Sequence, residues 1–265
     1  MRVVMTLAQP QAQVWAKAMT DQGHQVLLLP LIDTVVLPDT SALRQAWQDW
    51  PTYCAVMFVS PSAVHYFFAS KPAVMPYLQA KFAIKTRVWV TGHGTRSAVL
   101  AHGIPAQYID APELTGQQFD SEALWQQVQR TVRPGNRVLI VRGTSAQDIS
   151  HAMPGQGRDW LAQKIRAQGG QVQCVAAYLR RVPQWSTAQC EQARRAALDG
   201  SVWLLCSVLA VGNLKTLLGQ QDWSHARAVA THSRMISAAQ ALGFGTVRLS
   251  AASLSSVLTS VKSLA

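Results

Sequence analysis

Short apolar runs alternate along the chain with longer segments whose apolar residues recur every three or four positions. The first unit of this kind spans Arg2–Ile32 and consists of an apolar run, an amphipathic segment, a stop at Gly23 and a second apolar run. Short apolar runs are typical of buried strands, and a period near 3.6 is typical of helices. The alternation therefore predicts parallel β-sheets that are covered by helices on both faces.

Segments from the first part of the chain recur later in the same order. Three pairs share this relation: Arg2–Ile32 with Arg137–Tyr178, Ser60 with Ser207, and Val88–Ile104 with Ala228–Phe244. In the first pair, "QGHQV" and "QGGQV" differ at one position of five. In the second pair, a serine follows an apolar run and opens an apolar-periodic segment. Self-similarity of this kind predicts a duplicated architecture.

Two extended, proline-containing segments, at 33–40 and 178–185, indicate that the chain crosses between two domains twice. We therefore predict one discontinuous α/β domain of residues 1–35 and 184–265, and one inserted α/β domain of residues 38–180. The predicted fold class is two doubly wound parallel-sheet domains related by duplication. Because ligands of open parallel sheets bind at the carboxyl ends of the strands, we expect a cleft lined by strand-to-helix turns.

The charge points to an anionic partner. Lysine and arginine number 24 against 13 acidic residues, a formal net charge of +11, while 49% of the residues are hydrophobic. The apolar share predicts a packed globule, and the charge favours nucleic acid, phosphates or a ligand with many carboxylates. Charge alone leaves nucleic acid and a small polyanion both open. The scarcity of acids argues against a carboxylate-built metal site.

Nothing in the sequence indicates a membrane segment. The longest apolar runs, such as Val26–Ile32, are far shorter than the roughly 20 residues that span a bilayer. The N-terminus lacks the apolar core of a cleavable signal. The cysteines show no CxxC spacing, which favours buried, reduced thiols: Cys54, Cys174, Cys190 and Cys206. We therefore expect a cytoplasmic protein.

Ser60, in "FVSPSAV", is open to three interpretations. A nucleophile is disfavoured, since there is no GxSxG elbow and no histidine or acid at a recognisable spacing. A helix cap is favoured by Pro61, because proline suits the first helical position. Anion binding is the third possibility, since helix N-termini present free N–H groups. The choice between cap and anion site applies equally to Thr95 and Ser207.

Other motifs narrow the chemistry. "GHG" at Gly92–Gly94 begins like a dinucleotide loop, but Ser97 stands where the third glycine belongs. Nucleotide binding therefore stays a weak alternative, and the histidines form no metal-ligand spacing, so no metal site is predicted. Tyr178 ends an apolar run where the second crossing begins. There it could donate a proton or hydrogen bond into the cleft, or simply be a strand-end residue with a packed ring and an exposed hydroxyl.

Together the motifs resemble the uroporphyrinogen-III synthase family of tetrapyrrole biosynthesis, over essentially the whole chain. The resemblance rests on an ordered set of motifs: the strand Val3–Thr6, Pro30–Ile32, Phe58–Val64, Thr91–Gly103, Leu139–Gly143, Gly157–Arg158, "AAYLR" with Tyr178, and "CSVLAVGNL" with Ser207. The resemblance implies two α/β domains, no cofactor, and hydroxymethylbilane as substrate, a linear tetrapyrrole with eight carboxylates. It implies cyclisation with loss of water and inversion of ring D through a spiro intermediate.

The same resemblance implies roles for individual residues. Tyr178 assists the loss of the substrate hydroxyl, and substrate contacts fall to Thr6, Ser60, Thr95, Arg142, Ser207 and Ser233. The chain departs from the family pattern at Leu7, where arginine is usual, and at Met235, where threonine is usual. The expected protein is a monomer that contacts neither membrane nor nucleic acid and touches the preceding pathway enzyme transiently. The alternative is a non-catalytic two-domain binder of a small polyanion or nucleotide.

Overall fold

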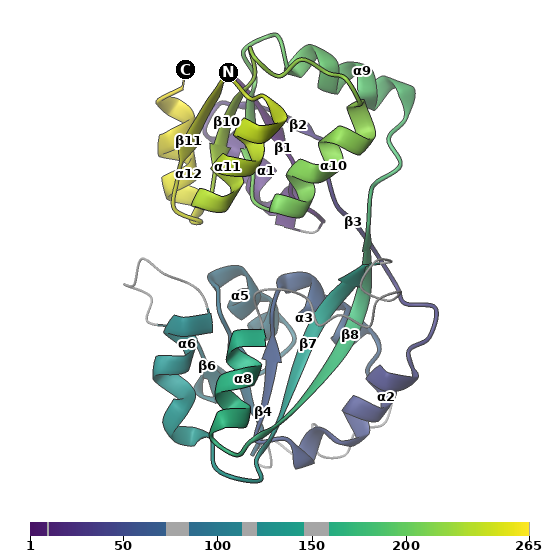
Figure 1. Ribbon diagram of the computed structural model, residues 1–265, viewed down its shortest axis with the longest axis vertical. Helices are drawn as coiled ribbons and strands as arrows, with labels where there is room; N and C mark the ends of the chain where they lie inside the picture. The colour runs from purple at the N-terminus through teal and green to yellow at the C-terminus, as the bar shows by residue number, and fades with distance from the viewer. Residues whose placement is uncertain (10, 73–84, 113–120, 146–158, 265) are drawn as a thin grey trace. The chain divides into compact units, whose positions relative to one another are not determined.

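The computed structural model describes residues 1–9, 11–72, 85–112, 121–145 and 159–264 (Figure 1). The motif at Gly157–Arg158 lies outside these residues. The chain divides into two compact units: unit 1 comprises Met1–Thr34 and Arg181–Ala265, and unit 2 comprises Val35–Arg180. The divisions fall within the two segments, 33–40 and 178–185, in which the sequence analysis places the crossings.

Unit 1 is built on a parallel sheet with the strand order β11-β10-β9-β1-β2. Its strands are β1 (Arg2–Met5), β2 (Gln25–Leu28), β9 (Val202–Leu205), β10 (Arg227–Ala230) and β11 (Thr246–Leu249). The helices are α1 (Gln11–Asp21), α9 (Thr187–Ala196), α10 (Val208–Leu218), α11 (Ser233–Leu242) and α12 (Leu254–Lys262).

Helices cover both faces of the unit 1 sheet because successive strand residues point to opposite sides. Val4 and Trp203 pack with residues of α9, α10 and α11, whereas Val3 and Met5 pack with residues of α1 and α12. The central strands β1, β9 and β10 are therefore buried on both faces, whereas the edge strands β2 and β11 are partly exposed. This double burial explains why the central strands appear in the sequence as apolar runs.

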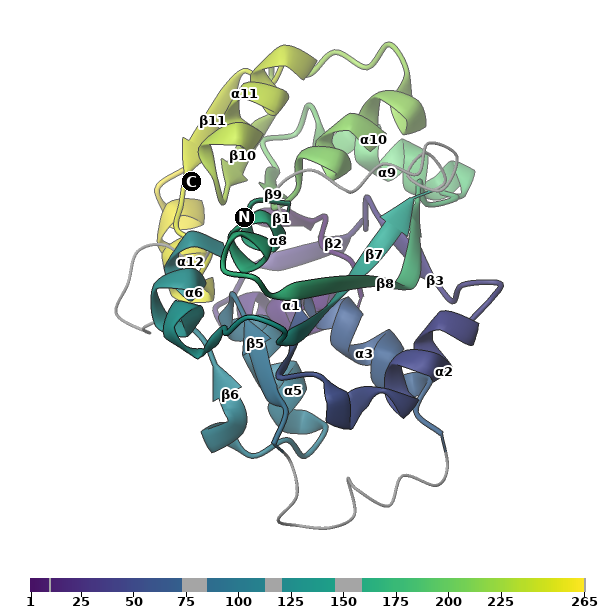
Figure 2. The same cartoon turned by 60° about the horizontal axis from the view of Figure 1, so that its bottom comes forward.

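Unit 2 is built on a sheet with the order β3-β8-β7-β4-β5-β6, parallel from β8 to β6. The strands of this sheet are β3 (Asp33–Val35), β4 (Ala55–Phe58), β5 (Arg87–Val90), β6 (Ile109–Asp110), β7 (Arg137–Ser145) and β8 (Gln171–Arg181), and the chain divides between the units within β3 and at the end of β8. The helices are α2 (Ser41–Gln48), α3 (Pro61–Ala69), α5 (His93–Ala101), α6 (Ser121–Val128) and α8 (Asp159–Ala167). Figure 2 shows α6 and α8 over one face of this sheet and α3 and α5 over the other.

The two units share one strand order. Apart from β3, unit 2 reads β8-β7-β4-β5-β6 where unit 1 reads β2-β1-β9-β10-β11. Each of the three repeated sequence pairs therefore occupies the same place in its own sheet. The predicted class of two doubly wound parallel-sheet units is confirmed. Among the described residues, no helix combines the length and apolar character that crossing a bilayer requires.

The expectation that all four cysteines are buried is wrong. None forms a disulfide, but Cys174 is exposed and the other three are half-buried. Cys174 lies near the start of β8, where none of the first four residues is fully buried; burial begins at Val175. The apolar residues next to Cys174 in the sequence therefore do not predict how exposed its side chain is.

The cysteines should differ sharply in reactivity. Cys206 is half-buried as a whole residue, but burial of its thiol raises the pKa of that group to about 12, although a hydrogen bond with Thr231 opposes the rise. Only the thiolate reacts, so at pH 8 about one Cys206 thiol in 10,000 is reactive. Brief iodoacetamide treatment followed by peptide mass spectrometry should find Cys174 modified and Cys206 intact. Cys174→Ser should remove the rapidly labelled peptide. Equal labelling of Cys174 and Cys206 would contradict the assignment.

Candidate active site

In unit 2, Ser60 lies at the carboxyl edge of the sheet, where β4 passes into α3. Its backbone is extended, and its Oγ accepts a hydrogen bond from the Ala63 N–H at 3.1 Å. Pro61 occupies the first helical position. The cap prediction is therefore confirmed for Ser60, since the hydroxyl satisfies one of the free donors of the first turn.

The structure brings Ser60 and Tyr178 together. Ser60 Oγ and Tyr178 Oη lie 3.1 Å apart, close enough for a hydrogen bond. The prediction that Tyr178 ends its strand is wrong, because β8 continues to Arg181 alongside a lengthened β7. Tyr178 is 6% exposed, so the alternative of an exposed hydroxyl is also wrong. Its hydroxyl instead lies at the N-terminal end of α3, next to the N-cap residue Ser60.

A β-bulge sets the direction of the Tyr178 side chain. Arg142 of β7 is opposite Ala176, but the next residue, Gly143, is opposite Tyr178, so Ala177 has no partner in the register. Such a bulge redirects side chains and is common beside functional sites. A Cβ atom on Gly143 would lie 2.7 Å from Tyr178 Cε2. Only glycine leaves room for this ring.

Tyr66 of α3 contacts the same ring. The centroids of Tyr66 and Tyr178 lie 5.4 Å apart, with the planes inclined by 20°. The sequence analysis assigned no role to Gly143 or Tyr66. A signal for Gly143 was available, since glycine inside an apolar strand indicates a bulge or a close approach of another group. No comparable signal marks Tyr66.

Thr95 and Arg142 lie near the same edge of unit 2. Thr95 is 4% exposed within α5, and the N-cap of that helix is Gly92. The cap interpretation of Thr95 is therefore wrong, because the helix begins two residues earlier, at His93. Arg142 is half-buried next to the bulge. Within the part of the chain that the structure describes, its guanidinium has no hydrogen-bond or ion-pair partner.

In unit 1, the corresponding edge carries Thr6 and Ser207. Thr6 follows β1, is 2% exposed, and donates its hydroxyl hydrogen to the carbonyl of Leu204. Ser207 has the extended N-cap backbone of α10, but its side chain makes no capping hydrogen bond. The cap prediction therefore fails for the Ser207 side chain. The backbone places a residue at the cap, but the rotamer decides where its hydroxyl points.

Ser233 begins α11 after the neighbouring strand β10. It is exposed, and its Oγ lies 3.4 Å from His232 Nδ1. His232 is the N-cap, and its Nδ1 accepts a hydrogen bond from the N–H of Arg234. An exposed hydroxyl and an exposed arginine thus stand at one helix N-terminus. These groups suit a carboxylate ligand, since the helix dipole favours negative charge at that end.

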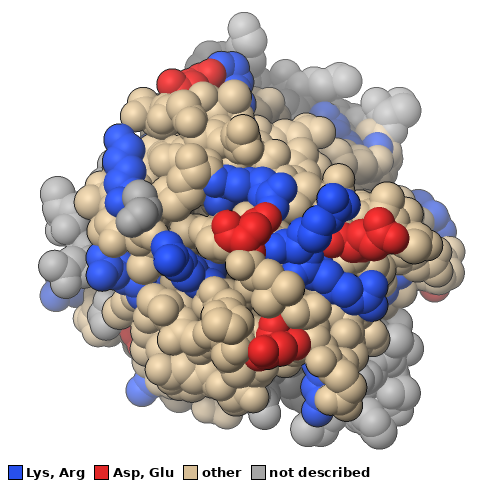
Figure 3. Space-filling model, turned by 90° about the horizontal axis from the view of Figure 1, so that it is seen from above, with Lys and Arg blue, Asp and Glu red and all other residues tan. Residues whose placement is uncertain are grey.

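The surface carries more cations than its acids can pair. Ion pairs join Arg2 to Asp199, Lys17 to Asp21, Arg87 to Asp110, Arg137 to Asp49 and Arg181 to Asp33. Figure 3 shows lysine and arginine side chains gathered on one face, several of them beside acidic side chains. The unpaired excess, part of the net charge of +11, gives the protein a field that attracts anions.

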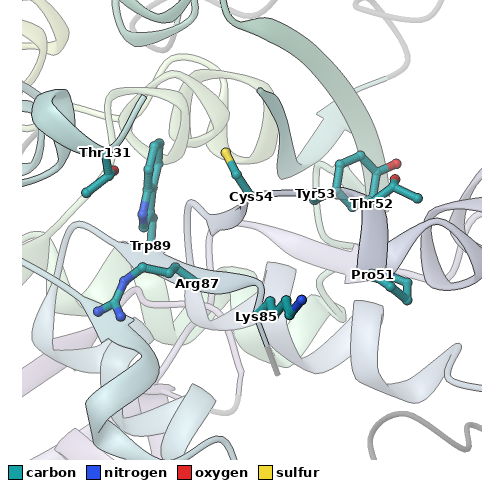
Figure 4. A pocket seen from close by; sticks show the side chains of 8 residues that line it. All are labelled: Pro51, Thr52, Tyr53, Cys54, Lys85, Arg87, Trp89 and Thr131. Atoms are coloured by element: carbon teal, nitrogen blue, oxygen red, sulfur yellow. The ribbon is translucent and has the colours of Figure 1, made fainter. Parts of the chain in front are cut away.

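A cavity of about 370 Å³ lies at the opposite, amino edge of the unit 2 sheet (Figure 4). Its lining includes Cys54 and Lys85, which precede β4 and β5. Most of its polar groups already have partners within the protein. Arg87 pairs with Asp110, and the Tyr53 hydroxyl donates to Gln173 at 2.8 Å. The predicted site residues of unit 2 do not line it.

Comparisons with known proteins agree with the motifs. A family model described as uroporphyrinogen-III synthase HemD matches residues 13–254. The structure is similar to that of a mutant uroporphyrinogen III synthase from Thermus thermophilus, at 15% identity over 99% of this chain and 98% of that chain, with a TM-score of 0.54. It is also similar to a uroporphyrinogen-III synthetase from Helicobacter pylori, at 11% identity over 100% of both chains, with a TM-score of 0.58.

The structural likenesses support the fold, and the family model matches most of the chain. The chain belongs to the uroporphyrinogen-III synthase family.

Proposed function

We propose that this protein cyclises hydroxymethylbilane to uroporphyrinogen III without a cofactor. The observation that carries the proposal is the Tyr178 hydroxyl, which lies 3.1 Å from Ser60 at the carboxyl edge of a parallel sheet, in a chain that belongs to this family. Ligands of open α/β sheets bind at this edge. An octacarboxylate substrate also accounts for the excess of basic residues.

The first step is the loss of water from the hydroxymethyl group on ring A. The C–O bond breaks, the hydroxyl leaves with a proton as water, and the electrons of the pyrrole ring form an azafulvenium cation, which becomes the neutral azafulvene when the ring N–H loses its proton. We assign to Tyr178 the hydrogen bond or proton that lets the hydroxyl leave as water. Ring D then attacks through its substituted carbon, and the spiro intermediate fragments and recloses with ring D inverted.

The chief task of the protein is to fold the substrate so that the substituted carbon attacks. An unguided chain closes without inversion, so orientation decides the product. Strand-to-helix turns suit this task because they offer N–H groups and hydroxyls to carboxylates. We assign direct carboxylate contacts to Arg142, Ser207 and Ser233. Thr6 and Thr95 are buried, so we assign to them the support of the turns and no direct carboxylate contact.

The test is the identity of the product. Enzymatically made hydroxymethylbilane is supplied to the protein, and the product isomers are separated after oxidation. Isomer III should form rapidly, while a reaction without protein should give isomer I. Formation of isomer I alone, at the uncatalysed rate, would refute the proposal. We also propose a cytoplasmic monomer that touches the preceding enzyme transiently and binds neither membranes nor nucleic acid.

A further inference from the structure

We propose that Ser60 is a positioning residue for Tyr178 and that it holds no substrate carboxylate. In this arrangement Ser60 donates its hydroxyl hydrogen to Tyr178 Oη. The phenol then keeps its own hydrogen for the leaving hydroxyl of the substrate. The inference rests on the proposed function, and it replaces the substrate contact that the family resemblance implies for Ser60.

The hydrogen-bond inventory of Ser60 favours Ser60 as the donor of this bond. A serine hydroxyl has one hydrogen and two lone pairs. One lone pair of Ser60 Oγ already accepts from the Ala63 N–H. Within the described residues, Tyr178 Oη is the remaining partner of Ser60 Oγ. If Tyr178 donated, the Ser60 hydrogen would have no acceptor there, whereas a bond donated by Ser60 uses it.

Gly143 and Tyr66 both approach the phenol ring closely. Gly143 lies so close that a Cβ atom there would be 2.8 Å from Tyr178 Oη and 2.7 Å from Cε2. Tyr66 stacks on the ring with a centroid distance of 5.4 Å. Together these contacts restrict the ring, whose hydroxyl lies next to Ser60. Such preorganisation avoids reorganisation at the moment of reaction.

Charge development gives the Ser60 hydrogen its role. When Tyr178 releases its proton towards the leaving hydroxyl, negative charge appears on Oη. The Ser60 O–H then points at that charge. Because Ser60 is the N-cap of α3, a helix of 9 residues, the N-terminus of this helix is next to the same charge. A hydrogen bond and a helix dipole that face a developing anion stabilise the transition state more than the ground state.

The test compares single and double variants by steady-state kinetics. Ser60→Ala should lower kcat for isomer III by about 10- to 100-fold, the usual effect of one hydrogen bond to a charged group, with KM unchanged. Ser60→Thr keeps a hydroxyl and should restore kcat. In a Tyr178→Phe background, Ser60→Ala should cause no further loss, because both changes remove the same interaction.

Two further variants separate this role from a structural one. Ser253→Ala removes the N-cap of α12, where Ser253 Oγ accepts from the Ser256 N–H at 3.2 Å, and should leave kcat unchanged. Gly143→Ala should lower kcat as Ser60→Ala does, since the new methyl group displaces the ring. Urea unfolding should show that Ser60→Ala and Ser253→Ala lose the same stability. The fall of kcat in Ser60→Ala alone then does not come from the loss of a helix cap.

The outcomes are distinct. A raised KM with unchanged kcat in Ser60→Ala, or independent losses in the double variant, would overturn the inference while isomer III still forms. A wild-type protein that yields no isomer III would overturn the proposed function and this inference with it.

Discussion

Tyr178→Phe should lower kcat for isomer III by about 100-fold or more, the usual effect of removing a general acid. The substitution keeps the ring contacts with Gly143 and Tyr66 and removes only the hydroxyl that contacts Ser60. Stability should fall by only about 1 kcal/mol, the usual contribution of one hydrogen bond. Rapid-quench product analysis measures the rate, and urea unfolding measures the stability.

Tyr53→Phe is the matched control for this experiment. Tyr53 is 2% exposed in the same unit, and its hydroxyl also donates to a side chain, Gln173, at 2.8 Å. It lies at the amino edge of the sheet, before β4, so turnover should not change. Undiminished turnover of Tyr178→Phe would remove the acid role and leave the fold as described.

Gly245→Ala should destabilise unit 1 by about 3 kcal/mol, at the upper end of the usual cost of overpacking. A Cβ atom on Gly245 would overlap the carbonyl oxygen of Ser224 and lie 2.9 Å from its carbonyl carbon. These are backbone atoms of the segment between α10 and β10, so no side-chain rotation relieves the clash. Gly245 is therefore required by space and not by a left-handed backbone, unlike Gly243, whose φ is 104°.

Gly212→Ala provides the opposite result in the same unit. Gly212 lies within α10, and a Cβ atom there would meet nothing within 4 Å. Alanine should stabilise this helix by about 1 kcal/mol because glycine loses more backbone entropy on folding. Urea midpoints followed by tryptophan fluorescence should move in opposite directions for the two variants. Urea midpoints equal to that of the unchanged protein would refute both assignments.

Local periodicity was enough to predict that strands alternate with helices in the repeated segments. The apolar runs and the repeated pairs depend on neighbours in sequence, and each pair occupies equivalent strands in its sheet. The detail at Tyr178 depends on residues far apart in sequence. The bulge beside Gly143 arises from pairing with β8, and neither strand alone shows a shift of register.

The hydroxyl contacts were also beyond prediction from the repeat. Ser60 and Ser207 occupy equivalent N-cap positions, but only Ser60 has its hydroxyl bonded to the helix turn. A duplicated backbone repeats the position of a residue, but the rotamer of each side chain depends on the residues around it. Thr95 shows the same limit, because whether a threonine caps a helix or is buried in its first turn depends on where the helix begins.

The strand order of unit 1 has a consequence for folding. Its central strands β1 and β9 pair across the whole inserted unit, and Arg2 bonds to Ser201, 199 positions away. Closing so long a loop in an unfolded chain is costly in entropy. The inserted unit 2 is continuous and can fold first during synthesis. Its first and last strands, β3 and β8, are adjacent in its sheet, so its folding brings the two halves of unit 1 together.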